Sequence, residues 1–269
     1  MATADGPREG GGNGAPKRCR IGTSGWAYAN WREVFYPRGV RQGEWLAYYS
    51  RFFDTVEVNA SFYRLPSETL ITGWLARTPE GFRFAVKAWR AITHFRRLED
   101  CADPLDRFLA RIALFGDRLG PILFQLPPRF PADPARLARF LERLPPEHRY
   151  AFEFRDPSWH VDEVYRILEQ EGAAFCPFDL AGLTAPRAVT ADFVYVRLHG
   201  HERRYRGAYD EGLLADWAGW LREQLARGRD AWVYFDNTDE AAHAVTDAMR
   251  LLRLVEGPPG ESAAPLTLR

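Results

Sequence analysis

The sequence predicts an α/β protein built as a single (β/α)8 barrel of the TIM type, and three observations lead to this prediction. Short β-rich runs recur along the 269 residues, amphipathic helical segments separate most of them, and polar residues gather near the carboxyl ends of the runs. Alternating strands and helices require crossover connections, and therefore a parallel sheet. Eight such units in roughly 235 residues match the usual size of this barrel.

The expected strands combine β-branched and aromatic residues with alternating polar positions, as strands beside a layer of helices do. In chain order they are RIGTSGW (20–26), TVEVN (55–59), FRFAVK (82–87), PILFQL (121–126), YAFEFR (150–155), AFCPFD (174–179), FVYVRLH (193–199) and WVYFDN (232–237). None of them is followed by a glycine-rich phosphate-binding motif. This favours the barrel over an open doubly wound sheet, which is the competing arrangement.

The segments between most strands repeat apolar residues every three or four positions, the pattern of an amphipathic helix. They are residues 44–53, 67–77, 104–115, 133–144, 161–172, 209–228 and 239–254. The interval LAGLTAPRAVTA (180–191) has room for a turn or two of helix at most. The sixth helix of the barrel is therefore expected to be short or missing.

Composition predicts one domain over residues 18–256 with a disordered tail at each end, 1–17 and 257–269, because both ends are rich in Gly and Pro and have little to bury.

Thirty-six basic residues balance 36 acidic ones, so no overall field recruits nucleic acid or an anionic membrane. The three cysteines have no CxxC spacing, which argues against a disulfide framework or a zinc ribbon. With no apolar run long enough to span a bilayer, we expect a cytoplasmic protein without a membrane partner, and the oligomeric state stays open.

Polar residues occupy one parity near the end of successive strands. They are Ser24, Glu57, Asn59, Lys87, Gln125, Glu153, Arg155, Asp179, Arg197, His199 and Asp236, which Asn237 follows. In a barrel this parity points inward, and catalytic groups come from the carboxyl ends of the strands. Aromatic residues in the loops that follow, including Trp26, Tyr63 and Trp159, would either line a mouth for a ring-bearing or sugar-like ligand or simply close the barrel.

The mixture of charges predicts metal-free acid–base catalysis on a small anionic or polyhydroxylated ligand, without a cofactor. Arg155 and Arg197 would hold a phosphate or carboxylate, and Glu153 and His199 would exchange protons. Lys87, one of only two lysines beside Lys17, would stabilise negative charge or form a Schiff base. The remaining catalytic candidates are Glu57, Asp179 and Asp236, and the remaining ligand-binding candidates are Asn59, Gln125, Asn237, Tyr63, Trp26 and Trp159.

Three alternatives stay open. A divalent metal could be held by Glu57, Glu153, Asp179, His199 and Asp236, which would make the protein a hydrolase of the phosphodiesterase or nuclease kind, or an isomerase. The charged residues could instead satisfy one another as a structural network of ion pairs. The basic loops HERRYRG (201–207) and HFRR (94–97) could bind nucleic acid without catalysis.

Seven ordered blocks of the chain resemble a known family. They are GTSGWAYANWREVFYP (22–37), TVEVNASFYRLP (55–66), FAVKA (84–88), LFQLPP (123–128), EFRDPSW (153–159), VRLHG (196–200) and YFDNT (234–238). The pattern is similar to the YecE-like family, also called domain of unknown function 72. The resemblance implies a TIM-type barrel and no established reaction. The family often shows two asparagines where this chain has Asp236 and Asn237, so the chain carries an additional carboxylate there.

Overall fold

The computed structural model describes residues 18–257, so the tails expected at 1–17 and 257–269 lie outside it except for Gly257. The strands are β1 (Cys19–Thr23), β2 (Thr55–Val58), β3 (Arg83–Lys87), β4 (Leu119–Leu126), β5 (Tyr150–Phe154), β6 (Ala174–Phe175), β7 (Phe178–Leu180), β8 (Leu183–Thr184), β9 (Phe193–Leu198) and β10 (Asp230–Phe235). Each expected strand is present, but the sixth is divided into β6 and β7. Residues Cys176 and Pro177 separate the two parts, and the Pro177 nitrogen has no hydrogen to donate to a ladder.

The α-helices are α1 (Trp45–Tyr49), α2 (Ala60–Tyr63), α3 (Glu68–Ala76), α4 (Ala102–Ile112), α5 (Pro134–Leu141), α6 (Asp162–Gln170), α7 (Glu211–Ala226) and α8 (His243–Glu256). Local chemistry fixes several of their starts. The side chains of Ser67, Asp133 and Asp210 accept hydrogen bonds from backbone N–H groups in the first turns of α3, α5 and α7. No helix lies between β7 and β9 in the described chain, which confirms the expectation for the sixth helix.

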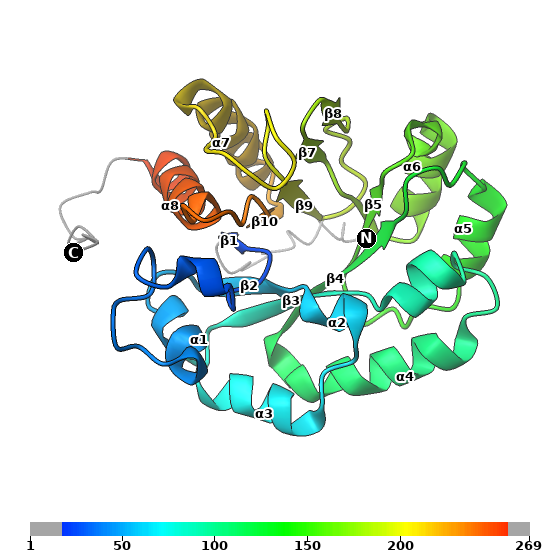
Figure 1. Cartoon of the computed structure of the whole chain (residues 1–269). Helices are drawn as coiled ribbons and strands as arrows, with labels where there is room; N and C mark the ends of the chain where they lie inside the picture. Colours follow the sequence, from blue (N-terminus) through cyan, green and yellow to red (C-terminus); the bar gives the residue numbers. More distant parts are fainter. Residues whose placement is uncertain (1–17, 258–269) are drawn as a thin grey trace, which may run out of the picture.

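Short helical turns complete the described chain. Those of the 3-10 type are η1 (Ala29–Trp31), η2 (Gln42–Glu44), η4 (Ala113–Arg118) and η5 (Pro157–Trp159), and η3 (Ala91–Phe95) is a π-helical turn. In Figure 1 the strands lie at the centre of the molecule and the longer helices lie around them. None of the helices within residues 18–257 is long and apolar enough to cross a membrane.

The strands form two five-stranded sheets, in the orders β1-β10-β9-β7-β8 and β2-β3-β4-β5-β6. All neighbours pair in parallel except β7 and β8, which form a short antiparallel ladder. This confirms a mixed α/β fold with parallel sheets. No single closed sheet is detected within the described residues, so the TIM-type barrel stays a prediction.

The two sheets meet at two places. At one meeting point Ser24 and Glu57 form an isolated parallel bridge, and the N–H of Gly25 donates to the Glu57 carbonyl at 2.8 Å. At the other, the segment 174–180 pairs with β5 through β6 and with β9 through β7. The carboxyl ends of β2 and β9, far apart in sequence, are thereby brought to the same side of the molecule.

Two separate groups of apolar residues make up the core. The larger, which we call the outer core, packs one face of the strands against the helices and includes Val56, Phe84 and Val196 with Leu214 and Val245. The smaller, the inner core, draws residues from both sheets: Ala85, Leu123, Ala151, Ala174, Cys176, Phe193, Tyr195, Trp232 and Tyr234. Since the inner core contains residues of both sheets, the sheets face each other across it.

We expect Gly22→Ala to destabilise the protein by about 2 kcal/mol, because β1 and β2 approach closely at this position and overpacking a core has costs of this order. A Cβ atom at Gly22 would lie 2.5 Å from the Thr55 carbonyl oxygen and 2.9 Å from the Tyr49 hydroxyl. Urea denaturation of the purified variant measures the effect.

Gly219→Ala is the matched control for this substitution. Gly219 lies within α7 and an added Cβ would meet no atom within 4 Å, so alanine there should stabilise the helix by about 0.5–1 kcal/mol. Equal stability of Gly22→Ala and the wild type would show that the sheets can separate at this point without cost.

Candidate active site

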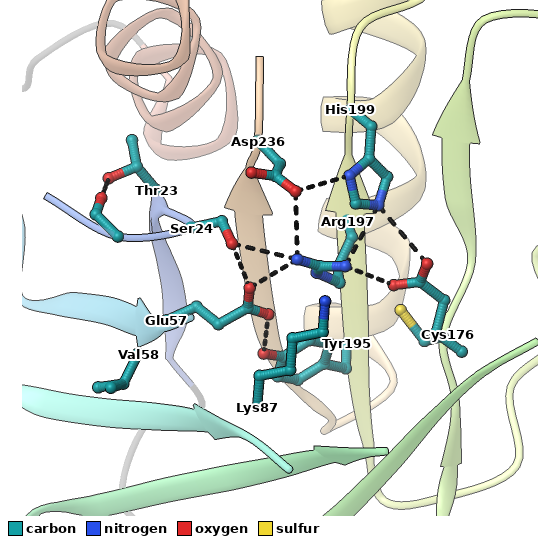
Figure 2. A network of polar contacts seen from close by, with 12 residues as sticks. Thr23, Ser24, Glu57, Val58, Lys87, Cys176, Tyr195, Arg197, His199 and Asp236 are labelled. Atoms are coloured by element: carbon teal, nitrogen blue, oxygen red, sulfur yellow. Dashed lines mark hydrogen bonds and ion pairs between the residues drawn. The ribbon is translucent and has the colours of Figure 1, made fainter. Parts of the chain in front are cut away.

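Eight polar side chains from six strand ends meet above the inner core, and we call them the ion network. They are Ser24, Glu57, Lys87, Glu153, Arg155, Arg197, His199 and Asp236. Figure 2 shows the Arg197 guanidinium in the middle, with Glu57, Asp236 and His199 around it and the Lys87 amine directed toward it. Seven of the eight were predicted as catalytic or ligand-binding residues, and Ser24 was placed among the polar strand ends.

Arg197 is the hub of the network. Its Nη1 donates to Glu153 Oε2 at 2.8 Å, and its Nη2 lies 2.8 Å from Glu57 Oε1 and 3.3 Å from Asp236 Oδ2. Its side chain is 0% exposed. Burial works against the charge of Arg197, but the three carboxylates outweigh it and raise the pKa of the guanidinium well above its usual value. Because both terminal nitrogens are already bonded within the protein, the predicted binding of a ligand anion by Arg197 has no support in this geometry.

A second chain of hydrogen bonds joins Arg155 to Asp236 through His199. Arg155 Nη2 lies 2.9 Å from His199 Nε2, and His199 Nδ1 lies 3.0 Å from Asp236 Oδ2. A guanidinium can only donate, so His199 Nε2 accepts and the ring proton resides on Nδ1, where it is donated to Asp236. Arg155 Nε also donates to Glu153 Oε1. The network thereby fixes both the orientation and the tautomer of His199.

Glu153 and Asp236 are held as carboxylates. Burial alone would raise the pKa of Glu153, but the guanidinium groups of Arg155 and Arg197 hold it well below its usual value. For Asp236, the same balance of burial against His199 and Arg197 leaves the pKa below its usual value. Glu153 is therefore ionised at neutral pH, which argues against the proton exchange predicted for Glu153 and His199.

Lys87 differs from the other cations of the network. Ser61 Oγ donates to the Lys87 carbonyl at 2.6 Å, and the ammonium lies 4.3 Å from the centre of the Phe62 ring. The described residues offer Nζ neither a hydrogen bond nor an ion pair. Burial, followed by repulsion from Arg197, lowers the pKa of Lys87 to about 8, although the carboxylates act in the opposite sense. A measurable share of this amine is therefore unprotonated near neutral pH.

Exposure divides the network and its neighbour Gln125 into two layers. Four residues are 0% exposed: Glu57, Glu153, Arg197 and His199. Four others reach the surface in part, with 8% exposure for Lys87, Gln125 and Arg155 and 7% for Asp236. We call these last four residues the rim. Gln125 pairs with Glu153 in the register of β4 and β5, which places it on the network side, and its amide nitrogen donates to the Leu126 carbonyl. A molecule arriving from solvent would meet the rim first.

Tyr195 is a member of the site that sequence reasoning missed. Its hydroxyl donates to Glu57 Oε2 at 2.7 Å, beneath the network, and burial, followed by the Glu57 carboxylate, raises the pKa of the phenol well above its usual value. The other oxygen of Glu57 accepts from Ser24 Oγ. The signal was present in FVYVRLH, where Tyr195 shares the parity of Arg197 and His199.

Asp179 was predicted on the inward face and the structure places it elsewhere. The register pairs Phe178 with Arg197 and Asp179 with Leu198, a residue of the outer core. Asp179 instead contacts His201, whose Nδ1 lies 2.9 Å from Asp179 Oδ2. Alternation along an unbroken strand puts Asp179 inward, and this prediction was wrong because Cys176 and Pro177 interrupt the strand and the register of β7 with β9 places Phe178 beside Arg197.

Other ligand-binding candidates also lie apart from the network. Trp159 is fully buried and its indole donates to the Phe130 carbonyl at 2.6 Å, so it packs in the outer core and lines no mouth. Asn237 is buried and donates to the Gly207 carbonyl and to Asp247, at 2.8 and 2.9 Å. It therefore holds the loop after β9 against α8.

Trp26, Asn59 and Tyr63 line a cavity of about 730 Å³, together with Tyr28, Trp74 and other residues. No member of the ion network lines it. The short helix α2 lies between the two, because Ala60 and Tyr63 face the cavity whereas Ser61 and Phe62 contact Lys87. These three predicted ligand-binding residues thus line a neighbouring cavity.

The described residues contain no group of three or more His, Cys, Asp or Glu side chains arranged to hold a metal ion. A cation bound by Glu57, Glu153 and Asp236 would have to displace the Arg197 guanidinium from all three carboxylates. Asp179, the remaining carboxylate of the proposed metal set, lies on the other face of the strand. The geometry of these donors therefore fits an ion-paired site better than a metal site.

One of the basic loops lies directly over the network. The N–H of Tyr205 donates to the His199 carbonyl at 2.5 Å, and the two rings are 5.7 Å apart in an edge-on arrangement. In the same loop Arg206 pairs with Glu240 at 3.5 Å, and in the other basic loop Arg97 stacks over Phe130. Some of the positive charge predicted to bind nucleic acid is therefore used within the protein.

Comparison with known proteins places the chain in a family. Residues 20–267 match the family model described as protein of unknown function DUF72. The UPF0759 protein YunF of Bacillus subtilis is 27% identical over 269 aligned residues, which cover 88% of this chain and 94% of YunF. The UPF0759 protein YecE of Escherichia coli K12 is 34% identical over 158 residues, 56% of either chain.

Solved structures agree with the sequence matches. A DUF72 family protein from Thermotoga maritima superposes with a TM-score of 0.81 at 27% identity, covering 89% of this chain and 100% of that one. A DUF72 family protein from Enterococcus faecalis gives 0.74 at 17% identity over 93% and 100% of the two chains, a likeness of fold alone. These findings confirm the resemblance carried by the seven sequence blocks: the chain belongs to the DUF72 family of proteins of unknown function.

Proposed function

We propose that the protein is an enzyme that carries out metal-free acid–base chemistry on a small anionic or sugar-like molecule bound at the rim. The main support for this proposal is that the network contains ions held in one charge state together with a group that can exchange a proton. Glu153, Asp236 and Arg197 are held in one charge state by their partners. Lys87, with a pKa of about 8, can gain or lose a proton near neutral pH.

The rim supplies the contacts that such a ligand needs. Lys87 and Arg155 offer positive charge for a phosphate or carboxylate, and Gln125 and Asp236 offer hydrogen-bonding groups for hydroxyls. Arg155 Nη1 bonds to none of the residues described here, so it is free to donate to an anion. The fixed ions beneath would hold these groups in place without rearranging during a reaction.

We also propose that the two sheets act together as the predicted (β/α)8 barrel. The bridge between Ser24 and Glu57, the segment 174–180 that pairs with both sheets, and the shared inner core support this interpretation. In such barrels the active site lies at the carboxyl ends of the strands, where the ion network lies. The three free cysteines fit a protein of the reducing cytoplasm.

We expect phosphate or a sugar phosphate to raise the melting temperature of the wild-type protein and to lose this effect in Arg155→Ala. A ligand at about 100 times its Kd stabilises a protein by about 2.7 kcal/mol, and removal of the free guanidinium nitrogen removes one of the two cations that would hold the anion. Thermal shifts of both proteins with inorganic phosphate and with sugar phosphates measure the difference.

Arg166→Ala is the control for this experiment, because Arg166 lies on α6 and is 69% exposed beside Asp162. Its response to phosphate should equal that of the wild type. If Arg155→Ala responds as strongly as the wild type, the rim does not bind the anion. A stoichiometric divalent metal in the purified protein, measured by elemental mass spectrometry, would contradict the metal-free mechanism.

A further inference from the structure

Lys87 is unusual both in sequence and in position. The chain has 36 Lys and Arg residues, of which only Lys17 and Lys87 are lysine. Lys87 is the last residue of β3 and is 8% exposed. Its ammonium has a ring beneath it, from Phe62, and no carboxylate bonded to it among residues 18–257. An arginine would keep its charge in this position, whereas a lysine can give up its proton and act as a nucleophile.

We propose that Lys87 forms an imine with the carbonyl group of an aldehyde or ketone, so that the substrates of this site are small carbonyl compounds such as open-chain sugars. The inference rests on the proposed function, because it assigns the substrate class of the same site. It selects one of the two roles that the sequence allowed for Lys87. If Lys87 only stabilised negative charge, an arginine in its place would do so equally well, and arginine is the cation that this chain uses almost everywhere else.

The reaction balances without an oxidant, a metal or a second substrate. The neutral amine attacks the carbonyl carbon, a C–N bond forms, and the oxygen takes up a proton to give a carbinolamine. The oxygen then leaves as water as the C=N bond forms. Counted from the ammonium, two of its three hydrogens depart with the carbonyl oxygen as water, and the third stays on the nitrogen of the protonated imine.

The charges around Lys87 suit this product. A protonated imine carries the same single positive charge as the ammonium that it replaces, so the balance with Glu57, Glu153 and Asp236 is unchanged. The cation draws electrons from the neighbouring carbon and makes its proton easier to remove. His199, which Asp236 orients through a 3.0 Å hydrogen bond, provides the acid–base group for the proton transfers.

The presence of only two lysines makes the test unusually direct. Purified wild-type protein is incubated at pH 7 with limiting glycolaldehyde or dihydroxyacetone and sodium cyanoborohydride, which reduces an imine to a stable secondary amine. Peptide mass mapping then follows labelling of Lys87, of Lys17 and of the N-terminal amine separately. Lys17→Arg leaves Lys87 as the single lysine, and Lys87→Arg keeps the positive charge and leaves only Lys17.

We expect Lys87 to be labelled at least about tenfold faster than Lys17, because a pKa near 8 gives roughly two orders of magnitude more neutral amine at pH 7 than an ordinary lysine has. Labelling of Lys87 should persist in Lys17→Arg. Labelling of Lys17 and the N-terminus with Lys87 unmodified would overturn the proposal. So would equal rates at the two lysines, since any exposed amine reacts slowly with an aldehyde.

The thermal-shift experiment separates the failure of this inference from the failure of the proposed function. A protein that binds phosphate through Arg155 but forms no adduct at Lys87 would refute the imine and leave the acid–base proposal intact. Thermal melting of Lys87→Arg provides the check on folding. If that variant melts like the wild type, the labels that remain at Lys17 and at the N-terminus measure the background reactivity of amines in the folded protein.

Discussion

Arg197→Met should cost about 3–5 kcal/mol of unfolding free energy at pH 7, the range observed when one partner of a buried ion pair is removed. The substitution keeps much of the side-chain volume but leaves Glu57, Glu153 and Asp236 without their common guanidinium, in a site where Arg197 and Glu57 are 0% exposed. Urea denaturation at pH 7 measures the loss. A protein of ordinary stability would be close to unfolding.

The loss should shrink in acid. Without Arg197 the effect of burial is less opposed, so the pKa values of Glu153 and Asp236 rise and the variant loses less stability than the wild type as the pH falls. In the wild type Glu153 and Asp236 have lowered pKa values, so their contribution is present above the unfolded pKa near 4 and is lost as the pH falls through the folded pKa. The two proteins should therefore converge mainly below about pH 4.

Arg227→Met is the matched control, because Arg227 pairs with Glu223 on the surface of α7, with 61% and 50% of the two side chains exposed. It should change stability by less than about 0.5 kcal/mol. If Arg197→Met lowered the free energy of unfolding by less than about 1 kcal/mol, the result would mean that water reaches the carboxylates freely. A loss that is the same at about pH 3 and at pH 7 would exclude Glu153 and Asp236 as its cause.

Lys87→Met should stabilise the protein relative to the wild type at pH 7, and this advantage should fall by about 2–3 kcal/mol between pH 7 and pH 10. The folded pKa of Lys87 is about 8 and that of an unfolded lysine is 10.5, so over this interval the unfolded wild-type chain binds more protons than the folded one. The wild type therefore gains stability as the pH rises, and methionine, which has no proton to lose, does not.

The difference between two proteins at each pH is the quantity to measure, because the buried tyrosines and cysteines titrate alike in both and cancel. Urea denaturation at four or five pH values would define the curve. Lys17→Met, which changes the other lysine, should differ from the wild type by the same amount at every pH. If the difference in stability between Lys87→Met and the wild type did not change with pH, the Lys87 ammonium would be as well solvated as that of an ordinary surface lysine.

Much of the fold was predictable because it depends on local pattern. Strand positions, helix positions and the missing sixth helix follow from periodicity and from residues such as Ser67, Asp133 and Asp210 that begin helices. The alternation in TVEVN and FVYVRLH correctly placed Glu57, Arg197 and His199 on one face. The error at Asp179 arose where β6 and β7 are too short for parity to be read from one end.

The use of each charged residue could not be predicted in the same way. Whether Arg197 binds a ligand or three carboxylates depends on how β2, β5, β9 and β10 are placed in space, and no local pattern carries that information. Aromatic residues in loops present the same difficulty. Trp26 lines a cavity and Trp159 packs inside the outer core, although both follow a strand and both are flanked by small or polar residues.

The separation of the inner core from the outer core has a consequence for the evolution of this protein. Tyr195 and Tyr234 of the inner core meet Glu57 and Thr55 through their hydroxyls and form the base on which the ion network rests. Val196 of β9 and Leu214 of α7 belong to the outer core, where the strands pack against the helices. Mutations that repack the helices can therefore accumulate without disturbing the chemistry, while the reacting groups can be exchanged without rebuilding the scaffold.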